Sequence, residues 1–224
     1  MDYNYRHSAS RLTIFAHFFG VLAFILMLIW LLHYRGGLQY DSYDNYDRVF
    51  NVHPFLMYCA FIFLAGEAMM AYKTVQASHH SRKIAHMVLH LSAFILGVVG
   101  ISAVFKFHDM AGIEDMYSLH SWIGLTTFCL FGMQWLFGLF SFFSPAATAE
   151  TRMRVAPLHR AAGRALLYLS ICAALTGIIE KFTFQRLKNE REARLMNFMG
   201  LSILLFGIFV DLSVALARDS SPPY

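Results

Sequence analysis

Long apolar stretches separated by short polar ones run along almost the whole chain. Each stretch holds about 20 or more mostly apolar residues, the length that an α-helix needs to cross a hydrocarbon core of roughly 30 Å. The stretches lack the strict alternation of a membrane β-barrel, and a helix satisfies its backbone polar groups within the segment. The pattern therefore predicts six transmembrane helices, at about residues 12–32, 54–72, 84–105, 119–143, 158–179 and 195–216.

The ends of the stretches refine this picture. Pro54 and Pro157 each fit the first turn of a helix, where the missing N–H does no harm, so both predict sharp helix starts. The first stretch ends in HYRGGL rather than in a small-residue cleavage site, so we interpret it as a helix and not as a signal peptide. We see no internal repeat or linker, which predicts one domain over residues 1–224, and the Pro-rich Ser220 to Tyr224 is expected to be a disordered tail.

Composition narrows the class of protein. Of 224 residues, 58% are hydrophobic and only 14% are charged, which excludes an ordinary soluble domain. The formal net charge is +4, but the basic residues lie beside apolar stretches, which excludes a nucleic-acid-binding face. Cys59, Cys129 and Cys172 all fall inside apolar stretches, so we interpret them as small buried side chains rather than as a disulfide framework.

The connections predict the orientation in the membrane. Residues 73–83 contain three basic and no acidic side chains, and residues 144–160 contain three basic and one acidic. Residues 34–52 and 107–119 are net acidic. Basic connections tend to face the cytoplasm, so the first two are predicted to be cytoplasmic, as are both termini. The connection at 180–196 carries charges of both signs with a small positive excess, which favours the opposite orientation. The other four connections together favour the first orientation, which we adopt.

Four of the eleven histidines stand out because each lies near the predicted start of successive helices: His53, His86, His120 and His159. Successive helices run in opposite directions, so His53 and His120 are predicted near the external face. His86 and His159 are predicted near the cytoplasmic face. Helices two apart in the chain can face each other across a four-helix bundle. The sequence therefore predicts two histidine pairs, one at each side of the membrane.

Two imidazoles without a matching Cys, Asp or Glu make a poor zinc site, which normally has four ligands. They suit haem iron, and a haem with two imidazole ligands has no open position, so it carries electrons. No CxxCH motif occurs, which predicts two haems of the b type. Glycines in the same helices, among them Gly138 and Gly177, fit close approach of a porphyrin or of a neighbouring helix. His90 is a candidate for supporting His86 from one turn away.

The chain resembles the cytochrome b-561 family of ascorbate-dependent transmembrane electron carriers, and its motif sequences are more similar to those of plant members than to those of animal members. The similar motifs are HYRGGL at residues 33–38, FNVHP at 50–54, GEAMMAYK at 66–73, KFH at 106–108, MYSLHSW at 116–122, the segment 157–159 and TGIIEK at 176–181. The resemblance implies two b haems, each bound by two histidines of the central four helices. It also implies ascorbate as the cytoplasmic donor, with monodehydroascorbate or ferric chelates as the acceptor on the other side.

The resemblance further implies roles for single residues. Lys73, Lys83 and Arg152 are expected to contact haem propionates or ascorbate, although a topology signal alone also predicts basic residues there. Phe107 and His108 are expected in the acceptor site. The residues expected near the edge of the external haem are Tyr117, Ser118 and Glu180.

Some positions depart from the family or lack a role. His79 stands where animal members often have a lysine, so the resemblance does not define the residues of the outer donor pocket. Arg164 is expected to pair with a propionate or with Glu67, and Glu67 is expected to be a neutral, hydrogen-bonded acid.

Two rival functions remain at this point. One is a b-type haem anchor that links quinone to a partner dehydrogenase, for which the short connections offer little docking surface. The other is a divalent-metal transporter, which would need acidic clusters inside the membrane. The resemblance favours an endomembrane such as that of the vacuole over the plasma membrane, and the sequence leaves a homodimer open.

Overall fold

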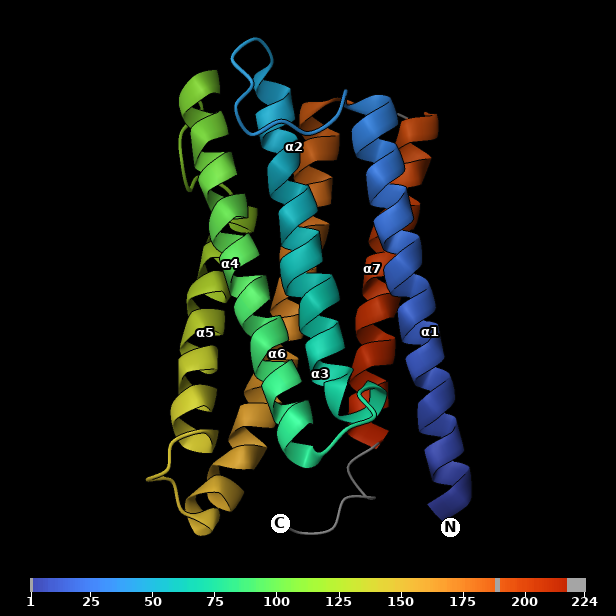
Figure 1. Cartoon of the computed structure of the whole chain (residues 1–224). Helices are drawn as coiled ribbons and strands as arrows, with labels where there is room; N and C mark the ends of the chain where they lie inside the picture. Colours follow the sequence, from blue (N-terminus) through green and yellow to red (C-terminus); the bar gives the residue numbers. More distant parts are fainter. Residues whose placement is uncertain (1, 188–189, 217–224) are drawn as a thin grey trace.

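The computed structural model describes residues 2–187 and 190–216. Within them, six helical segments are long and apolar enough to cross a membrane, and they run side by side (Figure 1). In chain order the helices are α1 (Asp2–Ile29), the π-helical η1 (Trp30–Tyr34), α2 (Tyr46–Met57), the π-helical η2 (Tyr58–Leu64), α3 (Ala65–Thr74), α4 (His79–Ala111), α5 (Leu119–Phe142), α6 (Ala149–Phe184) and α7 (Arg191–Leu216). The predicted all-α membrane fold is confirmed.

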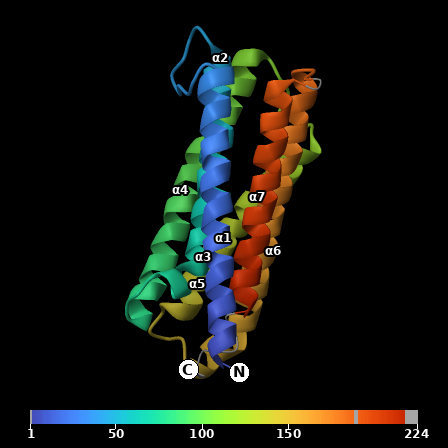
Figure 2. The ribbon, with the colours of Figure 1, turned by 90° about the vertical axis from the view of Figure 1, so that its right-hand side faces the viewer.

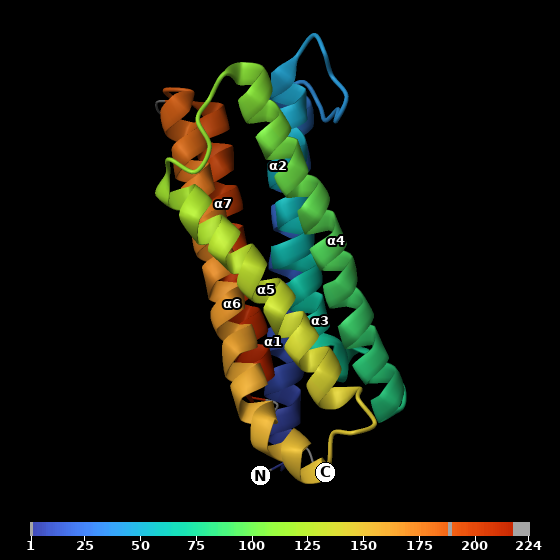
Figure 3. The ribbon, with the colours of Figure 1, turned by 90° about the vertical axis from the view of Figure 1, so that its left-hand side faces the viewer.

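The helices form a central four-helix core with two helices on its outside. The continuous segment α2–η2–α3 makes one member of the core, and α4, α5 and α6 make the others. α5 crosses the face of the bundle between α6 and α4 (Figure 3). α1 and α7 lie side by side outside the core (Figure 2). We call the end where α1 begins and α7 ends the lower end, and the opposite end the upper end (Figure 1).

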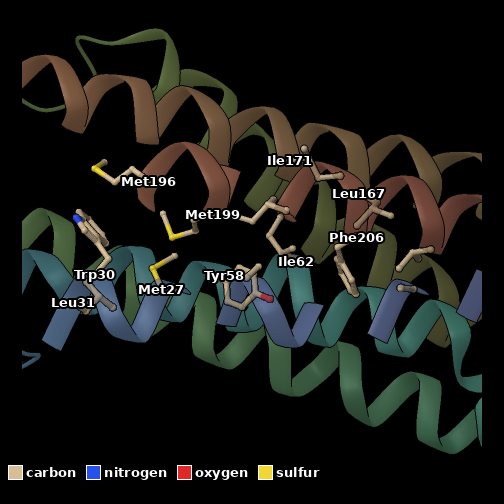
Figure 4. Packing of buried hydrophobic residues seen from close by; sticks show 14 of the residues in the cluster. Met27, Trp30, Leu31, Tyr58, Ile62, Leu167, Ile171, Met196, Met199 and Phe206 are labelled. Atoms are coloured by element: carbon tan, nitrogen blue, oxygen red, sulfur yellow. The ribbon is translucent and has the colours of Figure 1, made fainter. Parts of the chain in front are cut away.

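Large apolar side chains fix the outer pair against the core. Met27 and Trp30 from the first span, Tyr58 from η2 and Met196 and Met199 from α7 belong to one buried cluster (Figure 4). The hydroxyl of Tyr58 also donates to the backbone oxygen of Gly20 at 2.5 Å, so the one polar atom of its ring is satisfied. This packing fixes the rotation of η2, and with it the faces that α2 and α3 turn toward the core.

Two helices begin earlier than the prolines predict. Pro54 lies inside α2 and Pro157 inside α6, so neither marks a helix start, and that prediction is wrong. At α6 the reason is the Thr148 side chain, which accepts from the backbone N–H of Thr151 at 3.1 Å and caps the helix ahead of the proline. A π-helical turn, η2, follows Pro54, and such turns absorb a disturbance of the regular hydrogen bonding.

The same explanation extends to α4. Ser78 caps it by accepting from Ser81 N–H at 3.1 Å, so the helix starts at His79 and not near residue 84. The prediction of buried cysteines is wrong for two of the three. Cys129 and Cys172 are exposed on the bundle surface, where apolar residues would meet lipid, and Cys59 is partly buried. The predicted disordered tail, Ser220 to Tyr224, lies outside the described residues.

Candidate functional site

Two histidine rings face each other near the upper end. His53 on α2 and His120 on α5 have ring centroids 6.1 Å apart and ring planes at 88°. His53 Nδ1 lies 3.0 Å from the backbone oxygen of Gly100, and His120 Nδ1 lies 2.8 Å from that of Ala173. A carbonyl oxygen can only accept, so each Nδ1 carries the proton and donates it. Each Nε2 is thereby left unprotonated, as a metal ligand must be.

A second pair occupies the lower end. His86 on α4 and His159 on α6 have ring centroids 6.2 Å apart, with planes at 66°. His86 Nδ1 donates to the backbone oxygen of Ala68 at 2.7 Å. His159 Nδ1 instead meets a side chain, the Nε2 of Gln134, at 3.0 Å. This pair therefore repeats the ring separation of the upper pair with a different kind of support. An amide nitrogen can only donate, so His159 Nδ1 accepts there, and a metal at Nε2 would require the other imidazole tautomer.

The separation of the rings fits one metal ion between each pair. With metal–nitrogen bonds of about 2 Å on opposite sides, two imidazole centroids lie about 6 Å apart. Both observed separations, 6.1 and 6.2 Å, match this value. In the part of the chain that the structure describes, no group of three or more His, Cys, Asp or Glu side chains could hold a metal ion. The donor set of each site is thus two imidazoles, which is the axial set of a haem.

Glycines make room for the rings on the facing helices. A Cβ atom on Gly177 would lie 2.8 Å from Cε1 of His120, and one on Gly138 would lie 3.0 Å from Cε1 of His159. A cavity of about 550 Å³ opens beside the upper pair and is lined by His53, His120, Gly177 and other residues. The upper site therefore has both the ligands and the space that a flat cofactor needs.

A layer of phenyl rings separates the two pairs. Phe61, Phe94 and Phe128 each lie eight residues after a paired histidine, on three different helices, and a helix rises about 12 Å over that distance. Phe61 and Phe128 have ring centroids 6.0 Å apart, and Phe94 and Phe128 are stacked at 4.9 Å. The middle of the core is consequently apolar and aromatic.

The sequence predicts all four paired histidines near helix starts, and this is wrong for three of them. Only His120 is at the beginning of its helix, because Ser118 caps α5. His53, His86 and His159 lie well inside α2, α4 and α6, which extend beyond the apolar stretches into polar residues. The two facing pairs depend on alternating helix direction and not on where each helix begins.

Polar residues that the sequence assigned to the external side gather at the upper end. Tyr117 OH donates to Glu180 Oε1 at 3.0 Å, and Ser118 Oγ donates to Glu180 Oε2 at 3.1 Å. Burial, followed by the hydrogen bond and negative charge of Glu180, raises the pKa of Tyr117 to about 12, so its phenol is neutral at physiological pH. His108 Nδ1 lies 2.7 Å from Asp115 Oδ1.

Phe107 takes a different place from the other upper residues. Its side chain is buried, with its ring centroid 5.0 Å from that of Phe50. Phe107, His108, Tyr117 and Glu180 all line the 550 Å³ cavity together with the upper histidine pair. The residues expected in the acceptor site are thus collected around one opening.

Two of the three expected basic residues meet at the lower end. Lys83 donates to the backbone oxygen of Phe142 at 2.6 Å, and an Arg152 nitrogen donates to that of Ser144 at 3.3 Å. Lys83 therefore lies at the last residue of α5, and Arg152 lies on the connection that follows it. Lys73 does not join them: it donates to the backbone oxygen and, at 3.2 Å, to the hydroxyl of Ser213 on α7, outside the four-helix core. These acceptors satisfy its half-buried ammonium, and its contact with a haem propionate or ascorbate stays a prediction.

The residues without an assigned role also find partners. Arg164 forms an ion pair with Asp211 on α7, and Tyr168 donates to the same carboxylate at 3.1 Å, so the expected pairing of Arg164 with Glu67 is wrong. Glu67 instead lies 3.0 Å from His17 on α1. The reason is helix order, because α7 packs against α6 and separates Arg164 from α3.

His90 lies beside the lower pair. Its ring is edge-on to that of His86, with centroids 4.5 Å apart, and its buried Nδ1 has no hydrogen-bond partner among the described residues. His90 therefore contacts His86 by ring packing and not by a hydrogen bond to Nδ1, because that nitrogen already donates to the Ala68 carbonyl.

Six membrane-spanning helices with facing histidine pairs at both ends of a four-helix core define a membrane-bound cytochrome of the b type. The chain belongs to the eukaryotic cytochrome b561 family, whose sequence profile matches residues 52–185. The matched region contains all four paired histidines.

Similar proteins extend the match to nearly the whole chain. A "probable ascorbate-specific transmembrane electron transporter 1" of Oryza sativa subsp. japonica is 41% identical over 220 residues, which cover 96% of this chain and 94% of the relative. A "transmembrane ascorbate ferrireductase 2" of Arabidopsis thaliana is 44% identical over 202 residues, 87% of each chain. A transmembrane ascorbate-dependent reductase of Sus scrofa is 38% identical over 201 residues, 88% of this chain and 78% of the relative.

Three features of the site were not predicted from the sequence. Gln134 supports His159, Asp115 contacts His108, and Lys181 lines the upper cavity. The spacing of eight residues between histidines and phenylalanines was a visible signal for the aromatic layer. The polar contacts had no such signal, because each joins two helices or two ends of a loop.

Proposed function

We propose that the chain carries single electrons across a membrane, from ascorbate at the lower end to an acceptor at the upper end, by way of two b haems. The observation that supports this most directly is the presence of two facing histidine pairs at opposite ends of one core. Membership of the cytochrome b561 family, with relatives named as ascorbate-dependent reductases and electron transporters, makes the chain a transmembrane oxidoreductase.

In this proposal His53 and His120 would hold one haem, and His86 and His159 the other. A haem with two imidazole ligands supplies reversible one-electron chemistry and offers no open position to a substrate. Donor and acceptor must therefore bind against the chain's own side chains at the two ends. The Nδ1 hydrogen bonds to carbonyls keep the rings turned toward each other.

The lower end has the charge that an anionic donor needs. Lys83 binds the last residue of α5 and Arg152 binds the connection that follows, and Arg152 Nε is buried without a partner among the described residues. Ascorbate is an anion at neutral pH and would accept hydrogen bonds from such donors. The connections at this end carry the basic excess, so we place this end and both termini in the cytoplasm.

The upper end suits a small acceptor that arrives from the other side. Asp115 holds the His108 imidazole, which leaves its second nitrogen to hydrogen-bond an incoming molecule. Tyr117 is a neutral phenol held by Glu180. Monodehydroascorbate and ferric chelates are the acceptors that we propose, in an endomembrane such as that of the vacuole on the strength of the family resemblance.

A spectrum of the purified protein, recorded before and after addition of ascorbate, tests the proposal. We expect b-type absorbance bands that ascorbate reduces. Vesicles loaded with ascorbate should then reduce external ferric chelate, while vesicles with a protein lacking His53 and His86 should not. Bands that ascorbate fails to reduce would favour a haem anchor that serves a partner dehydrogenase. A protein that binds no haem would contradict the proposal.

A further inference from the structure

Lys181 places a cation in the wall of the upper cavity. It lies in the last turns of α6 and lines the cavity together with His53 and His120. Its side chain is only 12% exposed. The preceding residue, Glu180, turns its carboxylate to Tyr117 and Ser118, whereas Lys181 turns to another side of the helix.

The surroundings of this ammonium are mostly aromatic. Its Nζ lies 3.8 Å from the ring centroid of Phe50 and 5.9 Å from that of Phe107. The carboxylate that pairs with it is Asp47, at 3.8 Å, and the Asp47 side chain is 57% exposed. A charge-assisted hydrogen bond is about 2.7–2.9 Å long, so Asp47 provides attraction at a distance and no such bond.

A buried ammonium in this setting is costly unless an anion accepts hydrogen bonds from it. Cation–π attraction from the two phenyl rings offsets only part of the cost. The remaining donors are available to a ligand in the cavity that Lys181 lines. Other charged groups at the same opening are already bound, Glu180 by Tyr117 and Asp115 by His108.

We propose that Lys181 binds a carboxylate or enediolate oxygen inside the upper cavity. Two sources share this chemistry: a propionate of the haem that His53 and His120 would hold, and an anionic acceptor such as monodehydroascorbate. The inference rests on the proposed function, because both sources belong to it. A cation at this position favours the reduced state of a neighbouring redox group, since reduction adds negative charge.

The test compares Lys181→Met, which keeps the apolar stem, with Lys181→Arg, which keeps the charge. Lys106→Met is the matched control, because the Lys106 ammonium also lies at the upper end but is bound to Asp41 at 2.8 Å. Full-length proteins in lipid nanodiscs would be compared for haem content and by redox titration. Reoxidation would be measured with monodehydroascorbate and with hexaammineruthenium, a cationic acceptor without oxygen ligands.

If the oxygen belongs to a propionate, Lys181→Met should lower the midpoint potential of the haem that His53→Ala removes, leaving the other haem unchanged. Loss of that haem in Lys181→Met with retention in Lys181→Arg would support the same contact. If the oxygen belongs to the acceptor, both potentials stay unchanged. About tenfold more monodehydroascorbate should then be needed for half-maximal reoxidation, with hexaammineruthenium unaffected.

Three outcomes would overturn the inference. They are wild-type behaviour of Lys181→Met in both measurements, equal shifts in Lys106→Met, and loss of the haem in the Arg and Met variants alike. Failure of the proposed function would look different, because the wild-type protein itself would then bind no haem or resist reduction by ascorbate.

Discussion

Gln134 on α5 contacts His159 on α6 at two points. Its Nε2 lies 3.0 Å from Nδ1 of the imidazole and 2.7 Å from the backbone oxygen of the same residue. The other three paired histidines are held by backbone carbonyls of neighbouring helices. His159 is therefore the paired histidine whose support can be changed by substitution of a side chain.

We expect Gln134→Glu to lower the midpoint potential of the lower haem. Gln134 donates to Nδ1 through its amide nitrogen, whereas a carboxylate can only accept, so Glu at this position requires the imidazole proton on Nδ1. That tautomer leaves Nε2 free for the iron, raises the basicity of the ligand and stabilises the ferric state. Gln134→Leu should broaden or shift the bands of the same haem, because the ring loses its orientation. Redox titration checks both variants, with the upper haem as internal control. Shifts of equal size in both haems would show that Gln134 acts through general packing.

The four paired histidines should form two separable haem sites. His86→Ala or His159→Ala should remove the lower haem and leave about half of the haem per protein, because the upper pair is built from other residues. Pyridine haemochrome analysis and low-temperature spectra measure the effect. His33→Ala is a suitable control. Identical spectra of His53→Ala and His86→Ala would refute the pairing.

Glycine at position 177 should be needed for the upper haem. A Cβ atom there would lie 2.8 Å from the His120 ring, whereas one on Gly124 would meet nothing within 4 Å. We therefore expect Gly177→Ala to lose or distort the upper haem, and Gly124→Ala to keep it, although both residues line the same cavity. Haem content and the spectrum of each purified variant decide this. Equal retention in both would mean that His120 moves freely.

Lys83 should govern the reaction with ascorbate. Removal of one charge-assisted contact to an anion costs roughly 1.5–3 kcal/mol, which is about tenfold or more in affinity. Lys83→Ala should slow reduction at low ascorbate concentration and leave reduction by dithionite intact, as stopped-flow absorbance would show. Lys73→Ala is the control, because Lys73 is bound to Ser213 on α7. Unchanged ascorbate kinetics in Lys83→Ala would reduce Lys83 to a determinant of topology.

His108 should act in electron transfer to the external acceptor, with Asp115 as its positioning partner. Both His108→Ala and Asp115→Asn should slow reoxidation by monodehydroascorbate, because the imidazole loses its function or its orientation. Asp109→Asn removes the same charge from the end of α4, next to His108 in sequence but without that contact, and serves as the control. Vesicles preloaded with ascorbate provide the assay. Equal effects of the two Asp→Asn variants would show that the negative charge of this region matters and that the Asp115 contact with His108 does not.

Local composition was enough to predict the six membrane helices, their alternating directions and the two facing histidine pairs. These features follow from local composition and from the simple fact that consecutive spans reverse direction. Helix ends were less well predicted, because capping by Ser78 and Thr148 extends helices beyond the apolar stretches.

The contacts between polar side chains could be seen only in the folded structure. Arg164 pairs with Asp211 and not with Glu67, and Lys73 donates to Ser213 on α7. Gln134 contacts His159, and Lys181 contacts Phe50, each on another helix. The physical reason is that hydropathy fixes how deep a residue lies in the membrane. Its lateral partner depends on the rotation of each helix about its axis and on helix order, and both are set by packing of side chains distant in sequence.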